Sequence, residues 1–455
     1  MQKNLVSTNP GVVATGQKKS MRTVALSAFT GTALEWYDFG LYGWASALVF
    51  QQLFFVTDDP FLSMLGSFGS FAVGFFARPL GSIIFGHMGD RTGRKSMLIM
   101  TLGLMGVATF LIGLLPTFET AGAWAIILLT LLRIVQGIAV GGEFGGAALI
   151  TAEHAPRRQR GFWTSSTAAG APAGLLLSSG VFFLFSALPE DQFLTWGWRV
   201  PFLLSAVVLA VGMLIRLRVQ ETPLFKALED APKADHIPIV ELLKNHKSIL
   251  FRAVGARLVD AAAANVFTVF AVSFIVSTTG ASPGLSLGAG AAANAVHLVL
   301  IPVAAALSDR IGRRPLVITG AVVMGLMAGP GFMLMSTGND ALIILGVIVA
   351  WPLASVLIIG PTPAMLAELF PTHIRASGTS FVYQLQTLIA GVTPLIATAL
   401  LMAGGGQPWL IVAYIALLAV ITASCAASLP EVAGRDLNQD LPSRRGRSTV
   451  PATNR

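Results

Sequence analysis

Twelve long apolar stretches constrain the fold of this chain more than any other feature. A membrane-spanning helix needs about 20 largely apolar residues. Stretches of that kind lie near residues 23–50, 61–86, 96–116, 123–150, 162–188, 198–219, 249–277, 284–307, 315–337, 340–362, 377–403 and 407–429. With 54% hydrophobic and 11% charged residues among 455, the composition excludes a set of soluble domains. The sequence therefore predicts an all-α polytopic membrane protein with twelve transmembrane helices.

The basic residues alternate from loop to loop as membrane orientation requires. Lys and Arg populate the turns at 91–95, 157–160 and 310–314, the segment 220–248, Arg375 and the C-terminal tail. The loops at 51–60, 117–122, 189–197, 278–283, 338–341 and 404–408 contain neither. Because cytoplasmic loops carry the excess of Lys and Arg, both termini are predicted to be cytoplasmic. The net charge of +8 then reflects topology, and no nucleic acid partner is expected.

A basic turn occurs twice, each time between two apolar stretches. The first copy includes Gly86, Asp90, Arg91, Gly93 and Arg94, and the second includes Asp309, Arg310, Gly312 and Arg313. A second pair of landmarks repeats in the same order, namely Glu153, Pro156 and Arg160 in one half and Glu368, Pro371 and Arg375 in the other. Two landmarks in one order indicate that half of the chain is a diverged copy of the other.

This duplication divides the chain into five parts. We predict a cytoplasmic tail at 1–22, a six-helix bundle at 23–219, a cytoplasmic linker at 220–248, a second six-helix bundle at 249–429 and a cytoplasmic tail at 430–455. Within the linker, residues 239–244 have the pattern of a short amphipathic helix. The C-terminal tail is polar and has no heptad repeat, so it is expected to be disordered.

Asp90 and Asp309 each lie next to an arginine at the end of an apolar stretch. A carboxylate in that place can cap a helix N-terminus and bridge to a neighbouring helix. We therefore predict that the two basic turns form a conformational gate that holds the cytoplasmic side shut. The alternative, that these cations only fix the topology, explains the arginines but not the matching glycines and aspartates.

The twelve spans, the duplication and the basic turns together resemble the major facilitator superfamily, whose six-helix halves are related by an axis along the membrane normal. Within it, four stretches look like the metabolite:proton symporter family. They are Glu35-Trp36-Tyr37-Asp38-Phe39, Gly86-His87, Arg133-Ile134-Val135-Gln136-Gly137 running to Gly142-Glu143-Phe144, and Trp196-Gly197-Trp198-Arg199-Val200-Pro201-Phe202. The resemblance implies proton-driven uptake of small organic acids or zwitterions through the bacterial inner membrane.

Ionisable side chains at membrane depth cost at least about 2.5–3.5 kcal/mol each on insertion scales, so each is a functional hypothesis. In the first span, Glu35, Asp38 and Tyr42 share one helical face. A carboxyl group in a weakly solvated cavity can take up and release a proton, which suits Glu35 and Asp38 for proton coupling. Tyr42 is a candidate substrate ligand. The alternative is that one acid merely pairs with a nearby arginine.

The fourth span carries a second polar face. Arg133, Gln136, Val140 and Glu143 follow each other at spacings of three, four and three. Arg133 and Gln136 match the fourth-helix motif of the superfamily, in which the arginine is associated with proton transfer. Arg133 and Glu143 are therefore predicted to act in proton coupling, and Gln136 in substrate binding. Glu143 has the alternative of a structural partner for Arg133 or Arg160.

Candidate substrate ligands lie in both halves. Arg78, in the second span, has no acidic neighbour in its own helix and could seat a carboxylate, although pairing with Glu35 or Asp38 is the alternative. The candidates in the second half are Arg257, Asn265, His297, Tyr383 and Gln384. Arg257 and Asp260, three residues apart, can also neutralise each other. A membrane histidine is more often a packing residue than a ligand.

Three functions compete. Proton-coupled uptake of a small organic carboxylate such as α-ketoglutarate, citrate or shikimate is favoured by the intramembrane arginines Arg78, Arg133 and Arg257. The second is uptake of a zwitterionic osmolyte such as proline or betaine. The missing C-terminal coiled coil argues against an osmosensing transporter of this kind but not against others. A membrane enzyme or receptor is disfavoured because no metal-ligand spacing, P-loop or nucleophile elbow is found. Export is disfavoured because Gly170-Ala171-Pro172 matches the antiporter pattern only in part.

We therefore predict a transporter, not an enzyme, that works by alternating access. Its partners would be a small-molecule substrate, protons and the lipid bilayer. It is expected to need no metal or cofactor, to draw its energy from the proton gradient and to function as a monomer, because the two repeats already complete one pathway.

Overall fold

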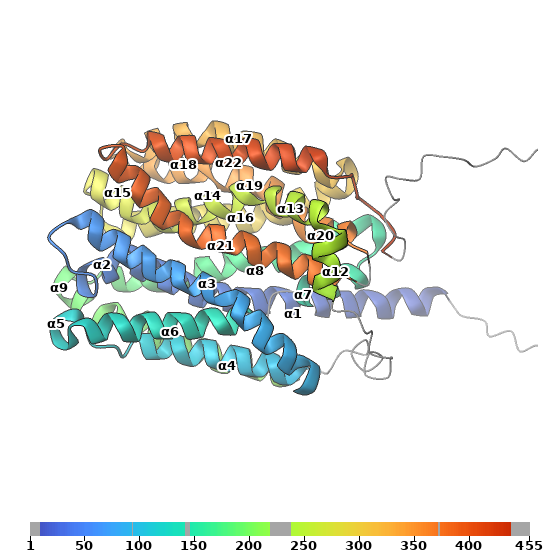
Figure 1. The fold of residues 1–455 in the computed structure, drawn as a ribbon, viewed down its shortest axis with the longest axis horizontal. Coiled ribbons are helices and arrows are strands. Elements are labelled where there is room, and N and C mark those ends of the chain that lie inside the picture. Colours follow the sequence, from blue (N-terminus) through green and yellow to red (C-terminus); the bar gives the residue numbers. More distant parts are fainter. Residues whose placement is uncertain (1–9, 93, 142–145, 219–237, 372–373, 438–455) are drawn as a thin grey trace, which may run out of the picture.

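The computed structural model describes residues 10–92, 94–141, 146–218, 238–371 and 374–437, and within its helices the side chains of residues 10–20, 82–83, 86–92, 94–98, 146–147, 215–218 and 238–240 are not described. These parts of the chain are helical apart from short connections and contain no strand. Figure 1 shows the helices lying side by side along the long axis of one bundle, with the start of α1 and the segment after α22 at the same end. The predicted all-α fold is confirmed.

The first half of the chain forms the lower part of the bundle in Figure 1. Its elements are α1 (Pro10–Ala45), η1 (Ser46–Phe50), α2 (Gln51–Leu53), α3 (Pro60–Thr92), α4 (Arg94–Ile112), α5 (Phe118–Ala121), α6 (Ala123–Gly141), α7 (Gly146–His154), η2 (Arg157–Gln159), α8 (Arg160–Ser186), α9 (Glu190–Gln192), η3 (Phe193–Gly197) and α10 (Arg199–Arg218).

The second half contributes a matching series. Its elements are α12 (Pro238–Asn245), α13 (Lys247–Gly255), α14 (Leu258–Asn265), η4 (Val266–Phe270), α15 (Ala271–Thr279), α16 (Pro283–Ile311), α17 (Arg313–Met335), α18 (Asp340–Ala350), α19 (Pro352–Ile359), α20 (Thr362–Leu369), α21 (Arg375–Ala403) and α22 (Trp409–Ser428). The helix predicted at residues 239–244 of the linker is present as α12.

Nine helices or helix runs in the described residues are long and apolar enough to cross a membrane, and the pair Glu190–Gly197 and Arg199–Leu214, bent by 42°, makes a tenth. Two predicted spans are weaker by composition. The first contains Glu35 and Asp38, and the third has only Ile99–Ile112 as an apolar helix. With these two, the structure agrees with twelve transmembrane helices in two six-helix repeats.

The most extensive contacts between the halves are α8 against α16 and α3 against α21, and α8 also packs against α1 of its own half. Gly161 permits the α8–α16 contact, because a Cβ atom there would lie 2.7 Å from the carbonyl oxygen of Ala305. Gly391 permits the α3–α21 contact, because its Cβ would meet the ring of Phe75 at 2.3 Å. Small residues therefore set how closely the halves approach.

Candidate functional site

A small cavity of about 20 Å³ lies inside the first half, between α1, α3, α4 and α6. It is lined by Glu35, Asp38, Phe39, Gly74, Arg78, Met105, Arg133, Gln136, Gly137 and Val140. The structure thus brings together five residues that the sequence singled out separately, two acids, two arginines and one glutamine. Val140 completes the predicted face of the fourth span, while Glu143 lies outside the described residues.

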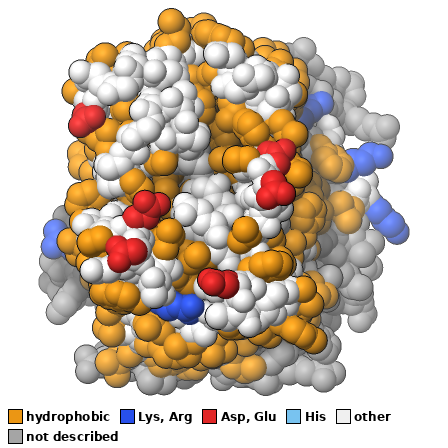
Figure 2. All heavy atoms as spheres, turned by 90° about the vertical axis from the view of Figure 1, so that its left-hand side faces the viewer, with side chains coloured by type: hydrophobic (Ala, Val, Ile, Leu, Met, Phe, Trp, Pro, Cys, Tyr) orange, Lys and Arg blue, Asp and Glu red, His pale blue; other side chains and the backbone are white. Residues whose placement is uncertain are grey.

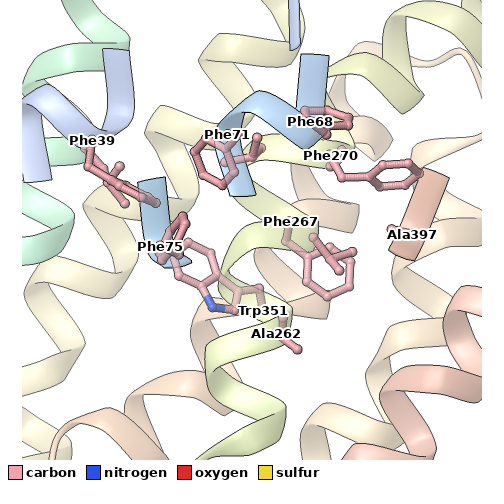
Figure 3. Close-up of a cluster of buried hydrophobic side chains, with 14 of the residues drawn as sticks. Phe39, Phe68, Phe71, Phe75, Ala262, Phe267, Phe270, Trp351 and Ala397 are labelled. Atoms are coloured by element: carbon pink, nitrogen blue, oxygen red, sulfur yellow. The ribbon is translucent and has the colours of Figure 1, made fainter. Parts of the chain in front are cut away.

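Arg133 is surrounded by aromatic rings. Its Cζ atom lies 4.2 Å from the ring centroid of Tyr42, 5.1 Å from that of Phe71 and 5.7 and 5.8 Å from those of Phe39 and Phe75. Such contacts stabilise a buried cation. Figure 3 shows Phe39, Phe71 and Phe75 within one buried cluster that also contains Trp351 and Phe267 of the second half.

The polar groups of this cavity form a short hydrogen-bonded chain. Arg133 donates to the carbonyl oxygen of Phe71 at 3.4 Å and to Oε1 of Gln136 at 3.3 Å, and Gln136 donates to the Thr109 hydroxyl at 2.7 Å. The hydroxyl of Tyr42 is hydrogen-bonded to Ser70 at 2.8 Å. The side chains of the fourth span are therefore held in place from α3 and α4.

The two acids of the first span have different surroundings. Glu35 interacts electrostatically with Arg78, whose Cζ lies 4.6 Å from the ring centroid of Phe75. Asp38 is 6% exposed, and within the described structure its Oδ1 atom has no hydrogen-bond partner. A proton can add to that oxygen without breaking an existing hydrogen bond.

A second charged centre lies inside the second half. Arg257 and Asp260 are both buried, with 3.5 Å between Nη2 and Oδ2, and the Ser355 hydroxyl donates to the other carboxylate oxygen. The Cζ atom of Arg257 lies 4.8 Å from the ring centroid of Tyr383. In the described structure, Nε and Nη1 of Arg257 have no acceptor. This guanidinium therefore has two buried nitrogens whose N–H groups are available for a ligand.

The remaining candidates of the second half differ in whether their side chains are hydrogen-bonded. Asn265 donates to the carbonyl oxygen of Ala390 at 2.9 Å, and Gln384 donates to that of Gly141 at 3.4 Å. His297 is 2% exposed, packs edge-on against Trp351 at 4.6 Å between ring centroids, and has no partner on either ring nitrogen among the described residues. Trp351 also marks a break between α18 and α19.

In the second basic turn, Asp309 bridges α16 and α8. Asp309, at the end of α16, accepts hydrogen bonds from the backbone N–H groups of Gly161 and Phe162 at 2.9 and 3.0 Å, which caps α8 from across the interface. Arg313 holds the same carboxylate at 2.7 Å. Gly312 has φ +104°, which ends α16 and starts α17. Arg310 is exposed.

A buried carboxylate lies at the centre of this end. Glu368 is 1% exposed and binds Arg160 of the first half at 2.7 Å and Arg313 at 3.3 Å. Its repeat counterpart Glu153 binds Arg375 at 3.6 Å, but the side chain of Glu153 is 34% exposed. Both pairs join the halves, and the one at Glu368 is the better buried.

Residues 430–437, which were expected from their composition to be disordered, pack across this network. Glu431 accepts hydrogen bonds from the backbone N–H groups of Arg313 and Arg314, both at 3.0 Å. Arg435 donates to the carbonyl oxygen of Glu368 at 2.9 Å and its own carbonyl accepts from Arg160 at 2.9 Å. The expectation of disorder failed here because Glu431 caps α17 and anchors the segment that follows.

The first basic turn is only partly covered by the structure. Gly93 lies outside the described residues, and Gly86, Asp90, Arg91 and Arg94 lie in α3 and α4 without described side chains. Their predicted part in a gate therefore stays a prediction.

At the opposite end, the π-helical segment η1 of the first half meets α15 of the second half, and Val269 of the π-helical segment η4 packs against Gly43 of α1. A π-helical turn disturbs the regular hydrogen bonds of the α-helix and is frequent at functional sites. In η1, the carbonyl oxygen of Ser46 accepts from Ser67 at 2.7 Å, and that of Ala47 accepts from Gln51 and from Ser273, both at 2.8 Å. The Ser273 bond crosses from α15 to the first half and therefore closes the interface at this point.

Replacing Ser273 by Ala is expected to make this contact open about fivefold more often, because a hydrogen bond contributes about 1 kcal/mol net. Labelling of Val269→Cys by a charged maleimide, in a Cys425→Ser background, measures the opening, since Val269 is buried against Gly43. Ser277→Ala is the control, because Ser277 donates within its own helix at 3.2 Å. Equal labelling in the two variants would contradict the assignment.

Several residues of these sites gave no signal in the sequence. Phe71, Phe75 and Trp351 are apolar side chains within apolar stretches, and Ser273 and Ser355 are single hydroxyls of the kind that most spans contain. Glu431 did have a signal in the sequence, because an acid directly after Pro430 at the end of the last span is suited to capping a neighbouring helix.

Comparison with known proteins matches these features to one family. The model of the family described as "Sugar (and other) transporter" matches residues 23–236 and 239–440. The shikimate transporter of Escherichia coli is 39% identical over 405 residues, covering 88% of this chain and 92% of that protein. The glycine betaine/proline/ectoine/pipecolic acid transporter OusA of Dickeya dadantii is 36% identical, covering 93% and 86%.

Solved structures agree on the fold. The crystal structure of a D-xylose-proton symporter superposes with a TM-score of 0.70 at 20% identity, covering 90% of this chain and 98% of that chain. A partially occluded inward open conformation of the xylose transporter XylE from E. coli gives 0.69 at 18% identity, covering 92% and 99%. The chain therefore belongs to the sugar (and other) transporter family of the major facilitator superfamily and is a multipass membrane transporter of small molecules rather than an enzyme.

Proposed function

We propose that this protein takes up a small organic carboxylate together with protons across the bacterial inner membrane. Residues 23–219 would rock against residues 249–429 around a site near the middle of the membrane, with both termini in the cytoplasm. No metal or cofactor is needed for this mechanism, and one chain contains the whole pathway.

The observation that carries the proposal is the state of Arg257. A buried guanidinium with two nitrogens whose N–H groups lack an acceptor is costly unless a ligand supplies one. A carboxylate supplies it, and arginine binds carboxylates strongly through charge-assisted hydrogen bonds. Tyr383 beside Arg257 and the unpartnered nitrogens of His297 add polar groups for the rest of such a substrate.

In this proposal the proton site lies in the other half. Among the described residues, those of the first half alone line the cavity around Asp38, so a proton there does not compete directly with a substrate at Arg257. Arg78 and Arg133 line this cavity together with Glu35 and Asp38, and would act on the charge of these acids rather than hold the substrate. Coupling would then pass through the α3–α21 contact.

The conformation fits a transporter closed towards the cytoplasm. The ion pairs of Glu368 and Glu153, the cap by Asp309 and the segment 430–437 all lie at the end that carries the basic loops. A cavity of about 640 Å³ lies at the other end, lined by residues of both halves. Breaking the ion pairs would open the cytoplasmic side and release the substrate.

Uptake of a zwitterionic osmolyte is the second candidate, supported by relatives such as the proline/betaine transporter of Salmonella typhimurium, 34% identical over 437 residues. A quaternary ammonium is recognised by the faces of aromatic rings. The rings of Phe39, Tyr42, Phe71 and Phe75 already surround arginine side chains, which favours the carboxylate.

Uptake into proteoliposomes under an imposed inward proton gradient tests the proposal. Labelled shikimate, α-ketoglutarate and betaine are compared, and we expect at least one carboxylate to accumulate and an uncoupler to abolish that accumulation. Arg257→Lys keeps the charge but loses the planar set of donors, so it should raise the KM for the carboxylate at least tenfold. Accumulation of betaine alone, or carboxylate uptake that the uncoupler does not reduce, would refute the proposal.

A further inference from the structure

The cavity of about 640 Å³ has an unusual charge for the entrance of an anion pathway. It lies at the end of the molecule away from the start of α1 and is walled by η1, α2, the start of α3, the end of α8 with α9 and η3, and α15 with the first residue of α16. Among the described residues that line it, Glu190 is the single charged one. The other polar groups of the lining are amides and hydroxyls.

Further acids stand next to this lining. Asp58 and Asp59 lie between the lining residues Thr57 and Pro60, and Asp191 follows Glu190. The six loops at this end contain no Lys or Arg at all. Figure 2, which looks onto this end, shows acidic side chains among hydrophobic and uncharged ones, with few Lys and Arg side chains.

The nearest basic residue along the chain does not offset these acids. Arg199 donates to the carbonyl oxygens of Gly113 and Leu115 at 3.0 and 2.5 Å and stacks on Trp198, and it is not part of the cavity lining. Its charge is therefore committed to joining α10 to the end of α4. A substrate that enters from this end meets a negative potential before it reaches the buried Arg257.

We propose that Glu190, with Asp58, Asp59 and Asp191, makes this mouth a charge filter that admits monocarboxylates and disfavours substrates with two or three negative charges. The inference rests on the proposed function and narrows it. The interaction of the mouth with a substrate grows in proportion to the charge of the substrate. Each acid that faces the path therefore lowers the local concentration about twofold for a monoanion, about fourfold for a dianion and about eightfold for a trianion at low ionic strength.

Wild-type protein gives the first test without any substitution. Uptake of labelled shikimate, which has one carboxylate, is measured with unlabelled shikimate, α-ketoglutarate or citrate as competitors. We expect raising the ionic strength from about 10 to about 150 mM to improve competition by α-ketoglutarate and citrate more than by shikimate, because salt screens exposed charges. Competition by unlabelled betaine, which has no net charge, should not change with ionic strength. The same salt response for all three acids would overturn the filter.

Glu190→Gln gives the second test, with Glu119→Gln as its matched control. Both acids are exposed at the same end, but Glu119 lies in α5, outside the cavity lining. We expect Glu190→Gln to improve competition about twofold for shikimate, about fourfold for α-ketoglutarate and about eightfold for citrate at low salt, and Glu119→Gln to change it little. Asp58→Asn should reproduce the trend if Glu190→Gln folds poorly.

The outcomes separate the filter from the function on which it rests. If no carboxylate accumulates in wild-type vesicles, the proposed function fails and the filter falls with it. If shikimate accumulates but Glu190→Gln and Asp58→Asn leave the ranking of the acids unchanged, the filter alone is wrong. Di- and tricarboxylates that fail to compete in Glu190→Gln at about 150 mM salt would place the discrimination at the inner site and also overturn it. Weaker competition by every acid in the variant would mean that Glu190 holds the substrate.

Discussion

Replacing Asp38 by Asn is expected to abolish concentrative uptake while leaving exchange of substrate across the membrane intact. Asp38 is buried, lines the small cavity of the first half and has an Oδ1 atom without a partner in the described structure, so it is the acid best placed to carry the proton. An inward gradient of about two pH units is worth about 2.8 kcal/mol per proton, which supports an accumulation near 100-fold. Asparagine cannot carry that proton, so the inside-to-outside ratio should fall to about one.

Glu35→Gln is the matched control, because Glu35 lines the same cavity three residues away but interacts with Arg78. It should lower the rate and retain accumulation. Accumulation by vesicles of each variant, and counterflow of labelled substrate without a gradient, separate coupling from transport. If Asp38→Asn still accumulates substrate and Glu35→Gln does not, the proton site has to move to Glu35. If both accumulate it, neither acid alone carries the proton.

The helical spans could be predicted from the sequence because their cause is local. A span of about 20 apolar residues has to be helical in lipid. The orientation inferred from the basic loops stays a prediction. Asp309 accepts hydrogen bonds from the start of α8, as a carboxylate at a helix end can, while its part in a gate also stays a prediction. The C-terminal tail was predicted to be disordered from its composition alone. Composition does not reveal that Glu431 caps the start of α17.

The site could be predicted only in part because its geometry depends on contacts between distant spans. Spacing placed Glu35 and Asp38 on one face, and Arg133, Gln136 and Val140 on another, and the structure brings both faces to one cavity. Spacing could not separate the two acids, since the partner of Glu35 comes from α3. Nor could it rank Arg78 against Arg257. The two arginines differ in their surroundings. Arg78 lies beside the rings of Phe39 and Phe75, whereas Nε and Nη1 of Arg257 have no acceptor among the described residues.

Replacing Glu368 by Gln is expected to open the cytoplasmic side and to cut transport strongly. Glu368 binds Arg160 and Arg313 at once, and its side chain has 0% exposure, so the substitution leaves two buried arginines without their carboxylate. Removing one partner of a buried ion pair costs about 3–5 kcal/mol. Because the network exists only while the halves are closed at this end, that cost falls on the closed state and should shift the population towards the open state at least 100-fold.

Glu153→Gln tests whether burial or the mere presence of an ion pair matters. Glu153 is the repeat counterpart of Glu368 and also bridges the halves, but its side chain is 34% exposed, so its pair with Arg375 should contribute only about 0–1 kcal/mol. Distances between spin labels at Arg158→Cys and Ile311→Cys, in a Cys425→Ser background, should lengthen in Glu368→Gln and stay nearly unchanged in Glu153→Gln. Equal lengthening in both variants would mean that the two ion pairs stabilise the closed state to the same extent. No change in either would mean that the cap by Asp309 and the segment 430–437 hold this end closed without the buried carboxylate.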